Sequence, residues 1–294
     1  MLFRSQPLPL IRHYKKKGPW VWRCHIDLSR PNRELWNYLL PFVEQYDAAI
    51  LSIKEYQQEL SIPQLFFMPA IDPFSIKNHV MTEHEIEERL SHHHIPTDKP
   101  IIVQISRFDR WKDPEGVIKA FLLASREIDA TLVMLGNVAT DDPEGVDVYE
   151  SLLKYRSDRI ILLSRDDTAL VNALQHRAAV VVQKSIREGF GLTVSEAMWK
   201  GTPVIGGRTG GIPYQITDGY NGFLVDSIDE TASRMVELVH NAALRNQMGE
   251  NSREVVRRSF LLIRLLEQYL DMFNSFETFY RMKPVTAQVE RVLV

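Results

Sequence analysis

The 294-residue sequence contains a single cysteine, Cys24, which excludes an internal disulfide and the cysteine-rich zinc modules. It also lacks any run approaching the roughly 18 apolar residues that suggest a membrane-spanning helix. No charge sign dominates, because 35 Lys and Arg stand against 38 Asp and Glu, for a net charge of −3. These absences predict a protein of a reducing compartment, the cytoplasm, that is not built mainly to bind nucleic acid or a membrane.

Core-forming residues, by contrast, are plentiful, at 45% hydrophobic and 10% aromatic. Between residues 97 and 259, short and nearly continuous apolar runs alternate with longer amphipathic stretches. Apolar strands separated by helices indicate βαβ units and a parallel sheet that is covered on both faces. The strands are predicted at 101–105, 131–136, 160–163, 179–182, 203–205 and 222–225, with helices that include 168–177 and 192–200.

This alternation predicts one doubly wound α/β domain. Ligands of such a domain lie beyond the carboxyl ends of its strands. Functional residues are therefore expected in the loops at that edge, which are residues 106–113, 136–142, 164–167, 184–192 and 206–211.

The first 95 residues are less regular. A helix is predicted at 33–46, with strands at 20–27, 48–53 and 64–68. Two or three βα units are too few for a complete second doubly wound domain, which usually needs on the order of 100–150 residues.

The most informative segment follows a predicted buried strand and opens a helix at residues 187–198. Gly189 and Gly191 let the backbone approach a ligand closely. The free amides of the first helical turn would point at an anion, helped by the helix dipole. The pattern is not the dinucleotide fingerprint, because Val194 stands where the third glycine would be. It predicts a phosphate site.

Two carboxylates bracket this turn. Glu188 precedes it and Glu196 lies in the first helical turns, so both can face one crevice and accept hydrogen bonds from neutral hydroxyls. A sugar attached to a phosphate suits this set of groups. A second interpretation stays open, because Thr193 and Glu196 also fit a capping box in which the glutamate only caps its own helix.

Two further loops fall at the same predicted edge. In the loop 106–112, Arg107 and Lys112 can both reach a diphosphate; the alternative is a solvated basic loop with Asp109 as a local ion partner. The loop 209–213 contains two glycines that allow close backbone approach, although a tight strand-to-helix turn explains them equally well. Their coincidence at one sheet edge favours a ligand site.

Together, residues 106–112, 188–198 and 210–225 resemble the retaining nucleotide-sugar glycosyltransferases of family 4, which have the GT-B fold of two facing Rossmann-like domains. Residues 20–29 and 68–73 are similar, more narrowly, to the branch of glucosyl-transferring trehalose synthases and trehalose phosphorylases. The resemblance covers nearly the whole chain to about residue 273.

The resemblance implies a role for each candidate residue. Glu188 would hold hydroxyls of the donor sugar and Glu196 the ribose of the nucleotide. Arg107 and Lys112 would bind the diphosphate and stabilise the leaving group, while His25 would face the donor sugar near the reacting carbon. The remaining donor-binding positions would be Gly189, Phe190, Gly191, Leu192 and Thr193.

The implied reaction transfers glucose, with retention, from a nucleotide-glucose donor to glucose, and forms trehalose. Positive side chains would replace a metal, so neither a metal ion nor another cofactor is expected, and the nucleotide sugar is a substrate. Phosphorolysis of trehalose and a catalytically silent nucleotide-sugar-binding fragment remain the alternatives, and a homodimer is allowed.

The resemblance also implies the domain limits. Residues 1–95 would form the trailing part of an amino-terminal, acceptor-side Rossmann-like domain and its linker, whose beginning is expected to be missing. Residues 96–259 would form the nucleotide-sugar-binding domain. Residues 260–294 would contain a tail helix that crosses back towards the first domain.

Overall fold

A computed structural model describes residues 7–137 and 143–282. Its contacts divide the chain into two compact units. Unit 1 contains Met1–Cys24, Leu28–Met68 and Leu262–Val294, and unit 2 contains His25–Asp27 and Pro69–Leu261. Part of the predicted edge loop 136–142 lies outside the described residues.

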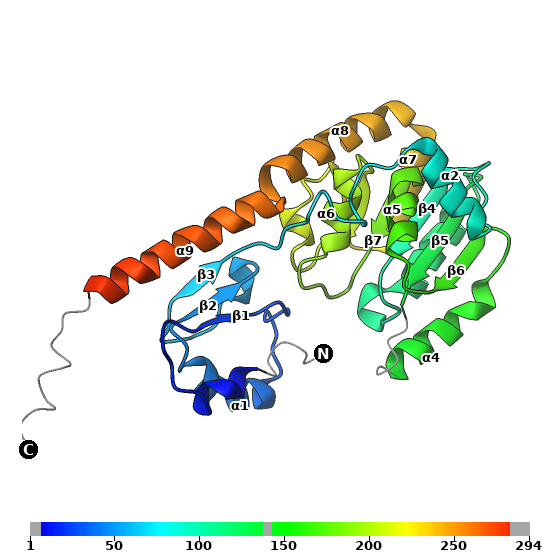
Figure 1. The fold of residues 1–294 in the computed structure, drawn as a ribbon. Helices are drawn as coiled ribbons and strands as arrows, with labels where there is room; N and C mark the ends of the chain where they lie inside the picture. Colours follow the sequence, from blue (N-terminus) through cyan, green and yellow to red (C-terminus); the bar gives the residue numbers. More distant parts are fainter. Residues whose placement is uncertain (1–6, 138–142, 283–294) are drawn as a thin grey trace, which may run out of the picture. The chain divides into compact units, whose positions relative to one another are not determined.

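Unit 1 holds a three-stranded parallel sheet in the order β1-β2-β3, with one long helix packed on it (Figure 1). Its core combines Ile50 and Phe67 from the sheet side with Met272 from that helix. The elements are β1 (Val21–Arg23), α1 (Arg33–Val43), β2 (Ala48–Leu51), β3 (Gln64–Phe66) and α9 (Leu262–Met282).

Unit 2 is built on a six-stranded sheet in which every neighbouring pair is parallel, in the order β6-β5-β4-β7-β8-β9. This is the doubly wound, Rossmann-like order, so the predicted fold class is confirmed. All residues of β4 and β5 are buried, as continuous apolar strands require. The strands are β4 (Ile101–Ile105), β5 (Thr131–Gly136), β6 (Ile160–Ser164), β7 (Val180–Gln183), β8 (Val204–Gly207) and β9 (Gly222–Val225).

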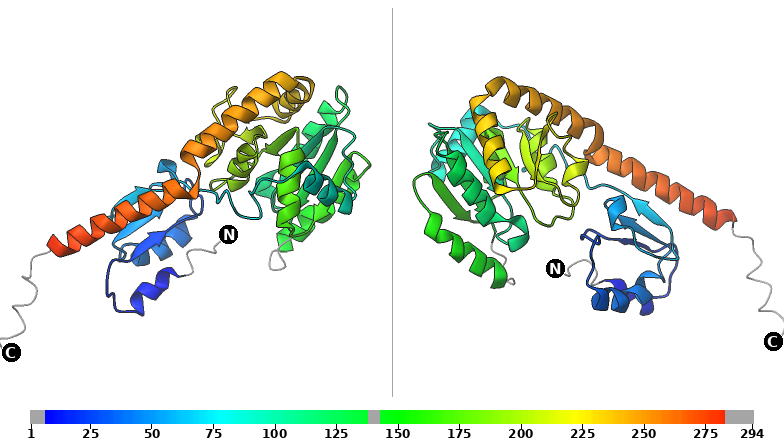
Figure 2. Two further views of the ribbon diagram at one scale, coloured as in Figure 1. Left: turned by 45° about the horizontal axis from the view of Figure 1, so that its top comes forward. Right: turned by 180° about the vertical axis from the view of Figure 1, so that it is seen from behind.

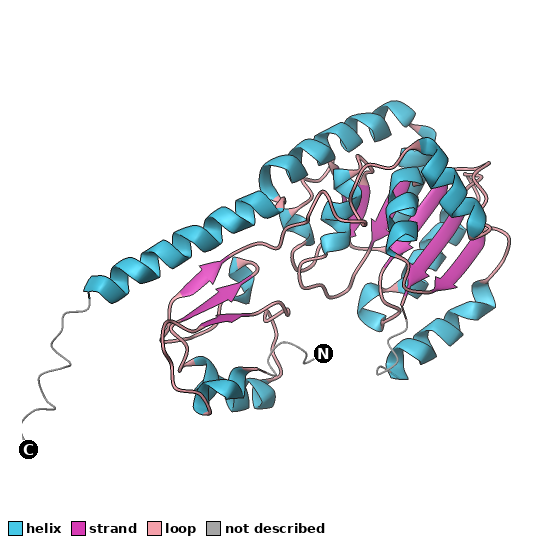
Figure 3. Cartoon of the chain, viewed as in Figure 1, coloured by secondary structure: helices cyan, strands magenta, loops and turns pink. Residues whose placement is uncertain are grey.

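Helices cover both faces of this sheet. In Figure 1, α5 and α6 lie on one face, and the view from behind in Figure 2 shows α3 and α7 on the other. Figure 3 shows the strands of this sheet, in magenta, flanked by helices, in cyan. The helices are α2 (Glu83–His92), α3 (Pro114–Ala124), α4 (Pro143–Leu152), α5 (Thr168–Arg177), α6 (Leu192–Trp199), α7 (Ile228–His240) and α8 (Ala242–Ser259).

The topological switch point of the sheet lies between β4 and β7. From β4 the chain winds outward through β5 to β6, then returns to place β7 on the other side of β4. The loops that leave these two central strands therefore diverge to opposite sides, and the crevice between them is where doubly wound folds bind ligands. These loops are the predicted segments 106–113 and 184–192.

The observed limits differ from the predicted ones mainly in unit 1. The strand predicted at 20–27 is only three residues long, because the chain leaves the sheet after Cys24, whose amide still bonds to the Ile50 carbonyl. Residues 69–95, predicted with the amino-terminal domain, group with unit 2, where α2 packs along α5. No helix within residues 7–137 and 143–282 is both long and apolar enough to cross a membrane.

Candidate functional site

An ion pair joins the two loops at the switch point. Lys112 ends a short 3₁₀ helix after β4, and Glu188 lies in the loop after β7. Lys112 Nζ donates to Glu188 Oε2 over 2.5 Å, and the two side chains are 16% and 8% exposed. The fold thus brings two predicted site residues into contact although 76 positions separate them in the chain.

The Glu188 carboxylate is also held by hydrogen bonds from its own loop and from the end of β7. Its Oε2 accepts hydrogen bonds from Ser185 Oγ at 3.1 Å and from Gln183 Nε2 at 3.4 Å, and its Oε1 accepts from the Gly189 amide at 3.1 Å. A carboxylate with this many donors has a fixed plane. Glu188 therefore presents preorganised acceptor oxygens beside a cation.

Arg107 and Lys112 have different partners. The Arg107 guanidinium donates to Asp109 Oδ2 at 2.9 Å, so the local ion pair considered as the alternative for this loop is present. Asp109 also accepts from the Lys112 amide at 3.1 Å and thereby starts the 3₁₀ helix. The alternative explains Arg107, whereas the Lys112 ammonium pairs with Glu188 of the other loop.

The capping-box interpretation of Thr193 and Glu196 is wrong. Gly191, with φ +81°, is the N-cap of α6, so Thr193 already lies inside the first turn. Within the described part of the chain, no side chain hydrogen-bonds to this helix end as a cap. The left-handed φ explains why a glycine stands at position 191, and Glu196 is left available for another partner.

The loop 209–213, which contains two glycines, packs directly against residues 188–191. We call residues 188–191 the donor loop. The Gly211 amide donates to the Gly189 carbonyl at 3.1 Å. Gln215 Nε2 donates to the Phe190 carbonyl at 2.7 Å. The Phe190 ring itself is buried and lies against Phe260, so Phe190 offers the site its backbone rather than its side chain.

Glu196 is buried on α6 and pairs with Lys77 of the segment between β3 and α2. Lys77 Nζ lies 3.0 Å from Glu196 Oε1, and the Glu196 side chain is 6% exposed. Its other oxygen, Oε2, is buried and has no hydrogen-bond partner among the residues that the structure describes. A buried carboxylate oxygen without a donor is costly unless a ligand supplies one, so this atom marks a place for a ligand donor.

Lys200, directly after α6, is a second buried cation in this region. Its ammonium donates to the carbonyls of Lys77 (2.8 Å) and Glu196 (3.2 Å) and to Asn78 Oδ1 (2.9 Å). Desolvation by burial lowers the pKa of Lys200 to about 7, against the opposing effect of the nearby Glu196 carboxylate. The charged form is thus disfavoured in the folded chain relative to the unfolded one.

This shift predicts a pH-dependent stability. The unfolded chain holds the Lys200 proton up to about pH 10.5, so the penalty for burying the charge is complete below pH 7 and fades as pH rises from 7 to 10.5. Denaturant unfolding of the unaltered chain and of Lys200→Met should therefore diverge between pH 7 and 9.5, in favour of the unaltered chain, by roughly 1 kcal/mol per pH unit. Parallel pH profiles would contradict the shift.

His25 belongs to a short segment, His25–Asp27, that groups with unit 2. Asp27 Oδ2 accepts from Arg187 Nε at 2.7 Å, which fastens the segment to the residue before Glu188. A Cβ built on Gly189 would lie 3.1 Å from the His25 carbonyl oxygen. The structure thus places the half-buried His25 beside the donor loop; its role stays a prediction.

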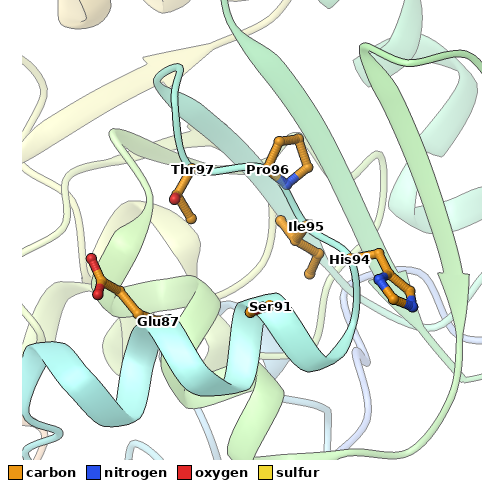
Figure 4. A pocket seen from close by; sticks show the side chains of 6 residues that line it. All are labelled: Glu87, Ser91, His94, Ile95, Pro96 and Thr97. Carbon is orange, nitrogen blue, oxygen red and sulfur yellow. The ribbon is translucent and has the colours of Figure 1, made fainter.

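A pocket of about 330 Å³ lies elsewhere, along α2 (Figure 4). It is lined by Glu87, Ser91, His94, Ile95, Pro96 and Thr97. None of these residues belongs to the loops at the carboxyl edge of the sheet, so the pocket is separate from the candidate site. In the described part of the chain, no three His, Cys, Asp or Glu side chains gather as a metal-binding group.

The sequence pattern did not single out several residues that shape the site, among them Lys77, Asp27, Arg187 and Gln215. Each acts through a partner that is distant in the chain, and no local spacing marks them. The only available signal was polarity in a segment between apolar elements, which is common to most loops.

Two family models match the chain. The model described as "Glycosyl transferases group 1" matches residues 85–255, and the one described as "Trehalose synthase, N-terminal domain" matches residues 1–58. The first therefore covers most of unit 2, including the switch-point loops.

Curated relatives agree with these matches. The chain is 43% identical to trehalose synthase of Thermococcus litoralis, over 94% of this chain and 69% of the relative. It is 28% identical to trehalose phosphorylase of Grifola frondosa, over 84% of this chain and 39% of that protein. Among solved structures, HepE of Anabaena in complex with UDP and glucose superimposes with a TM-score of 0.74 at 18% identity, covering 87% of this chain and 72% of that one.

Proposed function

Because this chain belongs to the group 1 glycosyl transferases, we propose that it transfers glucose from a nucleotide-glucose donor to a second glucose and so forms trehalose. The observation that carries the proposal is the Lys112–Glu188 pair at the switch point. In a nucleotide sugar, a phosphate and a polyhydroxylated ring are joined at one carbon. A cation in contact with a carboxylate matches that junction, with Lys112 on the phosphate and Glu188 on the hydroxyls.

With the sugar and its phosphate placed at this pair, the diphosphate and the ribose of the donor fall along α6 and the loop of Lys112. The α6 N-terminus, opened by Gly191, directs its first amides towards a phosphate. Farther along α6, Glu196 Oε2, which lacks a partner among the described residues, accepts a hydrogen bond from a ribose hydroxyl. Arg107 lies in the same loop as Lys112 and adds charge on the diphosphate side once it exchanges Asp109 for a phosphate oxygen.

Glucosyl transfer requires mainly that the leaving nucleoside diphosphate be stabilised. When the bond between the glucose C1 and the phosphate oxygen breaks, negative charge develops on the nucleoside diphosphate, and fixed cations and amides stabilise it best when they are preorganised. A leaving phosphate oxygen takes the proton of the acceptor hydroxyl as that hydroxyl attacks C1 from the same face. No protein nucleophile is required, and His25 lines the sugar side of the donor loop.

A phosphorylase is the second candidate, favoured by the 28% identity to trehalose phosphorylase of Grifola frondosa. The same cation and carboxylate would then face inorganic phosphate and the glucosyl ring. This reading predicts release of glucose 1-phosphate from trehalose that depends on phosphate and not on nucleotide.

Incubation of the purified chain with UDP-, ADP- or GDP-glucose and with glucose is expected to yield trehalose and the nucleoside diphosphate in equal amounts, measured by chromatography. A parallel incubation with trehalose and phosphate tests the phosphorylase. Nucleoside diphosphate binding by calorimetry, with no product in either reaction, would instead support a silent nucleotide-sugar-binding fragment.

A further inference from the structure

The segment Ser75–His79, which precedes α2, is fastened to α5 by a buried asparagine. Asn172 Nδ2 donates to the carbonyl of Ile76 at 3.0 Å and to that of His79 at 2.9 Å. Asn172 itself is fully buried. One side chain on a rigid helix thus holds the segment at two backbone positions.

The centre of the same segment is hydrogen-bonded to Lys200, directly after α6. The hydrogen bonds from the Lys200 ammonium reach the Lys77 carbonyl and the Asn78 side chain, and a third reaches the carbonyl of Glu196. Lys200 is therefore a direct bridge between the backbone of Lys77 and the helix residue that Lys77 pairs with. The backbone around Lys77 is thus held by Asn172 of α5 and by Lys200, so the Lys77 side chain starts from a fixed backbone position beside Glu196.

As a consequence, the Lys77 ammonium pairs with one carboxylate oxygen of Glu196 and does not engage the other. Nζ lies 3.0 Å from Oε1, while the buried Oε2 has no hydrogen-bond partner within residues 7–137 and 143–282. The Lys77 side chain is 37% exposed, and its Glu196 partner is nearly inaccessible. An exposed ion pair contributes little to folding. In this pair, by contrast, the carboxylate is buried and only one of its oxygens faces the lysine.

We propose that Lys77 is a positioning residue for nucleotide recognition, which holds Glu196 Oε1 so that Oε2 is aimed at a ribose hydroxyl. The inference rests on the proposed function, since it needs a nucleotide in this site. Lys77 acts through Glu196 and does not itself have to contact the ribose. Its loss should therefore weaken the recognition of ribose hydroxyls and leave the binding of the diphosphate unchanged.

The test compares ribonucleoside diphosphates with their 2′,3′-dideoxy forms. UDP, ADP and GDP are titrated by calorimetry into the unaltered chain, and the tightest binder is repeated as its dideoxy form. The unaltered chain should prefer the ribose form by roughly 10- to 100-fold, as expected for a hydrogen bond to a charged group. In Lys77→Met this preference should fall to within about threefold, with affinity for the dideoxy form unchanged, and Lys77→Arg should retain most of it.

Lys119→Met is the matched control, because Lys119 is an exposed lysine of α3 paired with Glu115 outside the site. In a Glu196→Gln background, adding Lys77→Met should cause no further loss of preference, because the two residues act as one unit. A Lys77→Met chain that discriminates as well as the unaltered chain would overturn the inference alone. An unaltered chain that binds none of the three diphosphates would overturn the proposed function, and the inference with it.

Discussion

Replacement of Lys112 with methionine is expected to lower kcat/KM for glucosyl transfer by about 10²- to 10³-fold, the usual effect of removing one preorganised group that stabilises charge in a transition state. Lys112 is the cation at the switch point, and its ammonium lies 2.5 Å from the Glu188 carboxylate. Methionine preserves much of the side-chain volume and removes the charge. Initial rates at several donor and acceptor concentrations measure the loss.

The same change leaves Glu188 buried without its cation, so stability has to be separated from catalysis. Breaking a buried pair from one side costs about 3 kcal/mol. The double variant Lys112→Met/Glu188→Gln removes both charges and should recover part of the unfolding free energy without recovering activity. Lys119→Met, on the exposed side of α3, should match the unaltered chain. Equal activity of Lys112→Met and Lys119→Met would contradict the assignment of Lys112.

The second large effect is expected at Gly211. A Cβ built there would lie 2.5 Å from Phe190 Cδ2 and 2.7 Å from Phe190 Cα. Because backbone cannot move aside as a flexible side chain does, Gly211→Ala must push the donor loop away or distort it. We expect a loss of about 1–3 kcal/mol in unfolding free energy. We also expect at least a tenfold weaker affinity for the nucleoside diphosphate, since a 1 Å shift of binding groups is costly.

Gly18→Ala provides the control for Gly211→Ala, because a Cβ at Gly18 would meet no atom of the described residues within 4 Å apart from its own chain neighbours. Chemical denaturation and calorimetry on both variants separate a steric effect at the donor loop from a general effect of alanine. Unchanged diphosphate affinity in Gly211→Ala would show that the donor loop does not carry the phosphate site.

The elements of unit 2 were predictable because β4, β5, β7, β8 and β9 are buried along their whole length, while the edge strand β6 is partly exposed, and the strands are mainly apolar. The predicted limits of β4, β5, β9 and α5 match the observed ones. In unit 1 the signal is weaker, since β1 and β3 are three residues long. The local pattern also suggested a capping box at Thr193 that does not exist. The spacing occurs inside a helix whose N-cap is Gly191, which has a left-handed backbone.

The amino-acid sequence by itself determined the class of fold and the edge at which function gathers. Periodicity separates strands from helices, and parallel strands place all their carboxyl ends on one side. Only the tertiary structure decided which loops meet. The order that sets β7 beside β4 creates the Lys112–Glu188 pair, and the packing of the segment 75–79 on α5 and α6 creates the Lys77–Glu196 pair. Such contacts depend on strand order and helix packing across tens of residues, and a local pattern of residues carries no information about either.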